Sequence, residues 1–210
     1  MRHTLSDNIY LIDGSGVIYK ASITDADPRA CRVEIKEINR KNNPGRCKLH
    51  IAIAPPKQSD RFEWFVEKAV EIGIDEITPI KCQRSERQEI KVERFEKIVI
   101  ASMKQAIIAK KPVINQIIPY TRFIKTVQNS NPEKYIAYCG ESKKTLLHEA
   151  IIKGNDTIIL IGPEGDFTPD EIQLAITSGF KPVSLGSTRL RTETAAIVSC
   201  VAYNLSNPGL

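Results

Sequence analysis

The sequence has few of the features that support a metal site, a disulfide framework or a membrane anchor. No apolar run reaches the roughly 20 residues that span a bilayer, and Met1-Arg2-His3 does not begin a signal-peptide pattern. The cysteines lie far apart and form no CxxC pair, which argues against zinc and against disulfide stabilisation; they are Cys31, Cys47, Cys82, Cys139 and Cys200. We therefore expect a cytoplasmic protein with reduced thiols and no bound metal.

Net charge is also modest. The chain has 30 basic and 25 acidic side chains in 210 residues, a formal charge of +5. This balance tolerates a polyanionic partner without requiring one. The hydrophobic share of 41% and charged share of 26% are those of an ordinary soluble protein, and the length allows one sizeable core with a small added module.

Strand and helix patterns alternate from residue 49 onward, which is typical of an α/β sheet with parallel strands and ligand-binding loops at their carboxyl ends. Nearer the N-terminus, two short apolar segments, 9–12 and 17–19, flank Asp13-Gly14-Ser15-Gly16, a sequence typical of a β-hairpin turn. The polar segment 39–48 contains Pro44-Gly45 and has no periodicity. We expect a β module at 1–40, a linker at 41–48 and an α/β domain at 49–210. The expected strands include 49–54, 74–80 and 135–139, and the expected helices include 59–73, 92–109 and 145–152.

One strand-loop-helix passage begins at Thr157–Ile161, a continuous apolar and β-branched run that favours a strand buried on both faces. The following loop, 162–166, has two glycines whose backbone N–H groups can approach a ligand. Thr168, Pro169 and Glu171 then predict a helix start with a capping box. The loop is therefore a candidate backbone-binding site.

A second passage of the same kind follows. Pro182–Leu185 predicts a strand, 186–194 a polar loop with one glycine and two arginines, and Ala195 to about Leu205 an apolar helix. Two ligand-type loops are thus expected to leave two strands of one sheet.

The two segments IGPEGDFTPDEI and LGSTRLRTETA, in this order and spacing, closely resemble the signature of the RsmE family. Its members methylate N3 of a uridine in bacterial 16S ribosomal RNA. The resemblance implies a fold of the SPOUT superfamily, with a trefoil-knotted α/β sheet, helices on both faces and S-adenosylmethionine as cofactor. Asp166 departs from the pattern, because many members carry a third glycine there.

The glycines of both loops allow the backbone to approach a cofactor closely. Ile161, Leu185 and Leu190 could form apolar walls of the cofactor site. The resemblance implies a larger cofactor set: Cys139, Gly140, Ile161, Gly162, Pro163, Glu164, Gly165, Leu185, Gly186, Leu190 and Thr194. Methylation of N3 removes an imide proton, and a fixed cation would stabilise the resulting anion. Arg191 is the first candidate and Arg189 the second; Glu164 and Glu193 could each remove the proton, or only cap or brace the loops.

The resemblance also implies RNA contacts and assembly. It identifies residues 1–40 as a PUA-like RNA-binding β module, here without a counterpart of the family's first strand, so we expect an incomplete and apparently truncated barrel with an exposed edge. Candidate RNA-binding residues are Arg2, Arg84, Arg87 and Lys104. We expect a homodimer whose substrate is 16S rRNA or the small ribosomal subunit. Two alternatives stay open: a methyltransferase acting on another RNA position, and an RNA-binding or ribosome-assembly protein without turnover.

Overall fold

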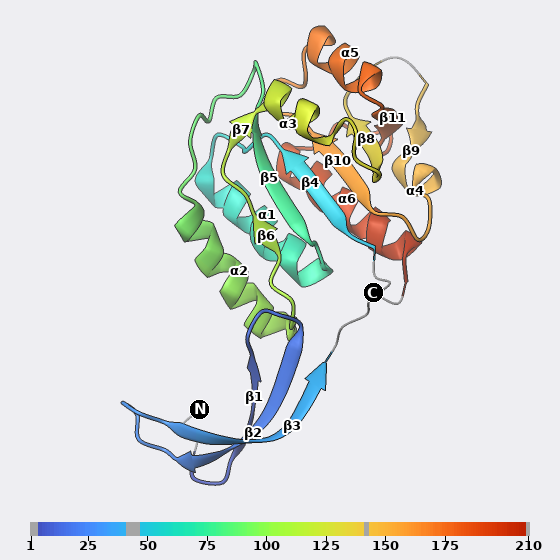
Figure 1. Cartoon of the computed structure of the whole chain (residues 1–210). Helices are drawn as coiled ribbons and strands as arrows, with labels where there is room; N and C mark the ends of the chain where they lie inside the picture. Colours follow the sequence, from blue (N-terminus) through green and yellow to red (C-terminus); the bar gives the residue numbers. More distant parts are fainter. Residues whose placement is uncertain (1–3, 41–46, 141–142, 209–210) are drawn as a thin grey trace.

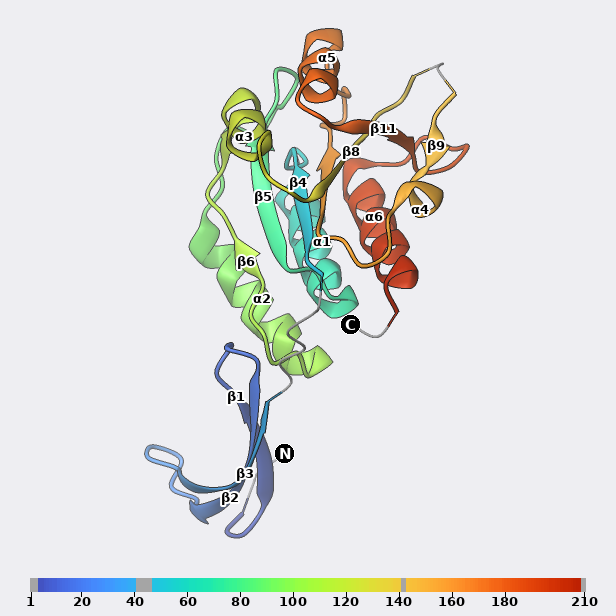
Figure 2. The same ribbon diagram turned by 45° about the vertical axis from the view of Figure 1, so that its right-hand side comes forward.

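The computed structural model describes residues 4–40, 47–140 and 143–208, which form two separate β-sheets (Figures 1 and 2). The smaller is antiparallel, in the order β1-β2-β3; the larger is parallel, in the order β6-β5-β4-β10-β8-β11-β9, with β7 paired beside β5. The strands are β1 (Asn8–Ile12), β2 (Val17–Asp25), β3 (Arg32–Arg40), β4 (Leu49–Ile53), β5 (Glu76–Lys81), β6 (Val113–Ile114), β7 (Ile118–Pro119), β8 (Glu133–Ala137), β9 (Thr145–Leu146), β10 (Thr157–Ile161) and β11 (Lys181–Ser184). The helices are α1 (Ser59–Ile72), α2 (Val92–Ala106), α3 (Tyr120–Val127), α4 (Leu147–Ala150), α5 (Pro169–Thr177) and α6 (Thr192–Ser206).

The large sheet is a central layer with helices on both faces. Alternate residues of β4 point to opposite sides: Leu49, Ile51 and Ile53 join the core under α1, α2 and α6, whereas Ala52 faces the core under α3 and α5. β10, between β4 and β8, is buried along its whole length. A strand buried on both faces explains why its sequence is continuously apolar.

The small sheet is open within the described residues, because β1 and β3 both pair with β2 but not with each other. The Asp13 carboxylate stabilises the hairpin turn by accepting hydrogen bonds from the Ser15 amide and hydroxyl and from the Tyr19 hydroxyl. The turn also contacts the large domain, where the Lys111 amide donates to the Gly14 carbonyl at 2.9 Å. β3 is mostly exposed.

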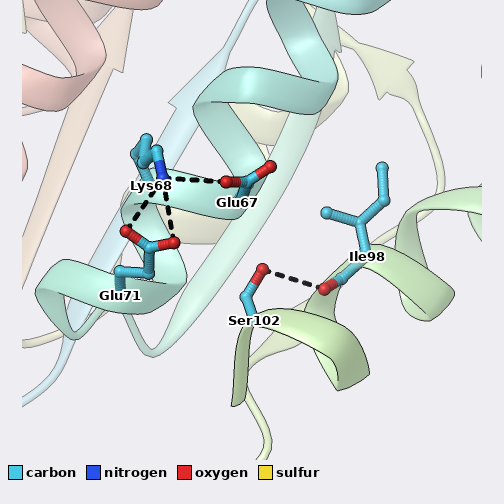
Figure 3. Close-up of polar contacts among 5 residues, drawn as sticks. All are labelled: Glu67, Lys68, Glu71, Ile98 and Ser102. Carbon is cyan, nitrogen blue, oxygen red and sulfur yellow. Dashed lines mark hydrogen bonds and ion pairs between the residues drawn. The ribbon is translucent and has the colours of Figure 1, made fainter. Parts of the chain in front are cut away.

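Helices α1 and α2 pack side by side on one face of the large sheet. On α1, the Lys68 ammonium contacts the carboxylates of Glu67 and Glu71, which raise the pKa of Lys68 (Figure 3). On α2, the Ser102 hydroxyl donates to the Ile98 carbonyl one turn earlier, so this small polar side chain is satisfied although buried (Figure 3). Neither set of contacts reaches the loops at the carboxyl edge of the sheet.

The predicted fold class, α/β with helices on both faces and a small N-terminal β-sheet, is confirmed. The trefoil knot stays a prediction. Several boundaries were wrong. α6 begins at Thr192 instead of Ala195, α4 covers only Leu147–Ala150, and α2 ends at Ala106 instead of 109. β8 and β5 are each shifted by one or two residues from the predicted 135–139 and 74–80. Most of the expected linker lies outside the described residues. Among those described, no helix is both long and apolar enough to cross a membrane.

Candidate cofactor site

A cavity of about 720 Å³ lies where the parallel strands β8, β10 and β11 end. Three segments line it: residues 138–140 (the β8 loop), residues 162–166 (the β10 loop) and residues 185–191 (the β11 loop). This is the edge at which open α/β sheets bind ligands, and the volume is in the range of small-molecule sites. All the predicted cofactor residues line it except Thr194, which is half-buried in α6.

The β10 loop is a tight turn closed by a hydrogen bond from the Asp166 amide to the Pro163 carbonyl at 2.9 Å. A Cβ at Gly162 would lie 3.1 Å from the buried ring of Phe167, a tight contact, so packing against Phe167 favours glycine at this position. The sequence had suggested approach by a ligand instead. Gly162 nevertheless lines the cavity, with its backbone as the contact surface.

Arg84, predicted to contact RNA, is bonded to this loop. Its Nη1 donates to the Gly165 carbonyl at 2.7 Å, and its aliphatic stem lies within 3.4 Å of where a Gly165 Cβ would be. The Glu164 carboxylate accepts a 3.1 Å hydrogen bond from the Lys57 amide. The Lys57 ammonium forms an ion pair with the Glu86 carboxylate. The loop is therefore tied to the segments that follow β4 and β5.

The β11 loop carries the two candidate catalytic arginines. Gly186 has φ 133°, a conformation that side chains rarely adopt, and a Cβ there would meet no protein atom within 4 Å. Arg189 and Arg191 are exposed and line the cavity; within the described residues neither guanidinium makes a hydrogen bond or ion pair. The Arg191 carbonyl accepts from the Ala195 amide, so the residue is fixed at the N-terminus of α6 while its side chain stays available.

The side chain of Glu193, a candidate base, is buried beside α1. Only 6% of the residue is exposed, and its Oε1 lies 3.8 Å from Nε of Arg61 on α1. Its Oε2 has no hydrogen-bond partner among the described residues. Glu193 is absent from the described wall of the cavity. This geometry favours bracing of α6 against α1 over contact with a substrate.

The remaining predicted RNA-binding residues are dispersed. Lys104 is exposed in the last turn of α2, and Arg87 is half-buried, with Nη1 unpaired among the described atoms. Arg2 lies outside the described residues. Among the described candidates, Arg84 alone bonds a loop of the cavity, and its own side chain is not part of the cavity wall.

Four residues that shape the cavity were not in the predicted site set: Thr192, Tyr138, Lys144 and Asp166. The Thr192 hydroxyl donates to the Gly162 carbonyl at 3.1 Å, Lys144 Nζ lies 4.1 Å from the centre of the Tyr138 ring, and Asp166 bonds the β8 loop. Thr192 lies inside the recognised second motif, which was the available signal. Tyr138 lies within the predicted strand 135–139 and Lys144 lies after it, and the sequence carried no other signal for either residue.

Residues 43–204 match the family model of an RNA methyltransferase domain. The fold and the cavity are those of this class of protein. The chain is 37% identical over 177 residues to ribosomal RNA small subunit methyltransferase E of Mesomycoplasma hyopneumoniae, covering 81% of this chain and 75% of that protein. The chain belongs to the ribosomal RNA small subunit methyltransferase E family.

Solved structures agree with this assignment. The crystal structure of a probable rRNA-methyltransferase from Porphyromonas gingivalis is 44% identical, with a TM-score of 0.85, covering 95% of this chain and 84% of that one. Ribosomal RNA small subunit methyltransferase E from Neisseria gonorrhoeae, crystallised with S-adenosyl methionine, is 27% identical with a TM-score of 0.87, covering 98% and 86%. The similarity therefore includes the small N-terminal sheet as well as the large domain.

Proposed function

We propose that this protein transfers a methyl group from S-adenosylmethionine to N3 of a uridine in 16S rRNA, acting in the cytoplasm. One observation carries the proposal. The cavity at the ends of β8, β10 and β11 is walled by the two family motifs and presents two arginines that have no partner among the residues the structure describes. Membership of the family supports the reaction class. Uridine N3 is the family's known target and is taken over from it.

The cavity fits the cofactor chemically. The cofactor supplies an electrophilic methyl group on a sulfonium cation. Backbone amides and carbonyls of the three loops would hold its adenine and amino-acid ends, and Ile161, Leu185 and Leu190 supply apolar contact. Glu164 places negative charge in the wall, which suits a cationic ligand.

Arg191 would stabilise the charge that develops on the uracil as N3 loses its proton to water or to Glu164, the candidate base that lines the cavity. The negative charge spreads to the two flanking carbonyl oxygens, and a planar guanidinium can donate to such an oxygen while remaining charged. Its fixed backbone and free side chain support this role. Arg189, exposed on the same loop, is the second candidate for contact with the nucleotide.

We assign Glu193 a positioning role, because its carboxylate is buried beside Arg61 instead of lining the cavity. Glu164 lines the cavity but accepts a hydrogen bond from the Lys57 amide. Positioning of the two substrates would then supply much of the rate enhancement.

RNA would bind across the basic segment after β5 and the small N-terminal sheet, with Arg84, Arg87 and Lys104 as contacts.

We propose a β module at 1–40, a linker at 41–48 and a knotted catalytic domain at 49–210. We also propose that the protein is a homodimer. Val201 and Leu205 of α6 are 39% and 76% exposed, which supports an apolar contact between two copies. Sedimentation at micromolar concentration should give twice 23.5 kDa; a monomer that still methylates RNA would exclude the dimer as the active form.

The cofactor site is tested by Gly186→Val, with Gly179→Val as a matched control. Both glycines have positive φ and open space at the Cβ position, but only Gly186 lines the cavity. Calorimetry should show S-adenosylmethionine binding to wild type and Gly179→Val and no binding to Gly186→Val, while circular dichroism stays unchanged. Equal binding by all three proteins would remove the cofactor from this cavity. Binding without methyl transfer to RNA would favour an assembly protein.

A further inference from the structure

Asp166 adopts a backbone conformation that side chains usually avoid. Its φ is 63°, one of three positive values at non-glycine residues in the described chain. Aspartate tolerates this region better than most residues, yet glycine would enter it at lower cost. The presence of a carboxylate at a position that favours glycine calls for a compensating contact.

Each carboxylate oxygen of Asp166 accepts a hydrogen bond from a backbone amide. Asp166 Oδ2 accepts a 2.8 Å hydrogen bond from the Cys139 amide of the β8 loop, and Oδ1 accepts one of 2.8 Å from the Phe167 amide. Hydrogen bonds to a carboxylate are stronger than those between neutral groups. One half-buried side chain therefore links the two loops that form adjacent walls of the cavity.

The link lies just past the end of the strand ladder. β8 and β10 pair in parallel as far as Ala137 opposite Ile161, after which the strands diverge into their loops. The Cys139 amide is thus beyond the last pair, and a backbone donor without a partner there would bind water or move. The carboxylate of Asp166 continues the connection between the two strands into the cavity mouth.

We propose that Asp166 is a positioning residue that clamps the Cys139-Gly140 peptide to the β10 loop and so preforms the cofactor wall. The inference rests on the proposed function for the identity of the ligand. A preformed wall raises affinity because less ordering remains to be done on binding. Since the clamp acts on wall shape, it should strengthen binding of the cofactor and of its demethylated product S-adenosylhomocysteine by the same factor.

The test compares wild type with Asp166→Gly and Asp166→Asn, and uses Asp170→Asn as a charge-matched control on α5. Asp166→Gly suits the positive φ, so the melting temperature should not fall. The Cys139 amide should exchange with solvent at least tenfold faster, and the Kd values of both ligands should rise together about tenfold, the factor expected for one charged hydrogen bond. Asp166→Asn retains one acceptor oxygen and should lie between wild type and glycine; Asp170→Asn should match wild type.

Two results would overturn the clamp. Unchanged Cys139 exchange in Asp166→Gly would show that the hydrogen bond does not hold the β8 loop. A loss confined to S-adenosylmethionine would show that the carboxylate acts on the sulfonium charge directly and does not shape the wall. If wild type binds neither ligand, the proposed function fails instead, and amide exchange still tests the clamp.

Discussion

The hydroxyl of Thr192, the first residue of α6, donates a hydrogen bond to the carbonyl of Gly162, the first residue after β10. This 3.1 Å contact joins the two recognised motifs inside the protein, where Thr192 is 5% exposed. It fixes the start of the helix that follows Arg191 relative to the β10 loop. The β10 loop and the backbone of Arg191, the proposed catalytic residue, are thereby coupled through one buried hydrogen bond.

Replacing Thr192 by valine should break this coupling while keeping the side-chain shape. We expect a loss of about 1 kcal/mol in unfolding free energy, because the Gly162 carbonyl loses its partner, and a several-fold rise in the Kd for S-adenosylmethionine. Thr192→Ser retains the hydroxyl and should bind nearly as wild type. Denaturant unfolding and calorimetry measure the two effects; equal affinities for the valine and serine variants would contradict the coupling.

Arg84 should affect the cofactor as well as RNA. Its guanidinium is bonded to Gly165, so Arg84→Ala should weaken cofactor binding several-fold in the absence of RNA. Lys104→Ala removes an equal charge from an exposed position in the last turn of α2 and should weaken only RNA binding. Titrations with cofactor alone and with RNA alone separate the two. If Arg84→Ala binds the cofactor as tightly as wild type, its hydrogen bond has no role in shaping the loop.

Arg191 should matter most in the chemical step. Its charge is proposed to act only when the uracil becomes anionic, so Arg191→Ala should slow single-turnover methylation about 10²–10³-fold with little change in either Kd. Arg191→Lys keeps the charge without the planar fork and should recover part of the rate. A rate equal to wild type in the alanine variant would move the catalytic role elsewhere, with Arg189→Ala as the next test.

His50 should make stability depend on pH. Burial lowers the pKa of His50 below its ordinary 6.5, more than neighbouring Glu76 raises it. The unfolded chain then binds the proton more readily, so this contribution is complete above about pH 6.5 and is lost as the pH falls toward the folded-state pKa.

The measurement is urea unfolding at several pH values from 7.5 downward. His50→Gln can keep a hydrogen bond to Thr78, which lies 2.8 Å from His50 Nε2, but cannot titrate. The stability difference between wild type and variant should therefore shrink as the pH falls below 6.5. A difference that does not vary with pH would show that His50 titrates equally in the folded and unfolded states.

Much of the large domain could be predicted because its signals are local. The boundaries of β10 match the apolar run, and the Thr168–Glu171 capping box is present with both hydrogen bonds. α3 was missed although Tyr120, Phe123, Ile124 and Val127 have helical spacing and are buried. Its eight residues give too short a pattern to stand out beside the strand before it.

The cross-links of the cavity could not be predicted in this way. Arg84 and Gly165 are 81 positions apart, and Asp166 and Cys139 are 27 apart, so no periodicity within one element relates them. The same holds for Glu193, whose partner Arg61 lies on another helix. The resemblance predicted that Cys139 and Gly165 lie near the cofactor, but only the folded arrangement decides which backbone groups each side chain bonds.

The most direct test of the central claim is to find where the methyl group goes. Wild-type protein, S-adenosylmethionine with an isotopically labelled methyl group, and small-subunit RNA or particles that lack the modification are incubated for a single turnover. The RNA is then digested to nucleosides for mass spectrometry. The account predicts label on N3 of uridine with wild type and Gly179→Val, and none with Gly186→Val. Label on another atom or nucleoside, or none although both substrates bind, would contradict it.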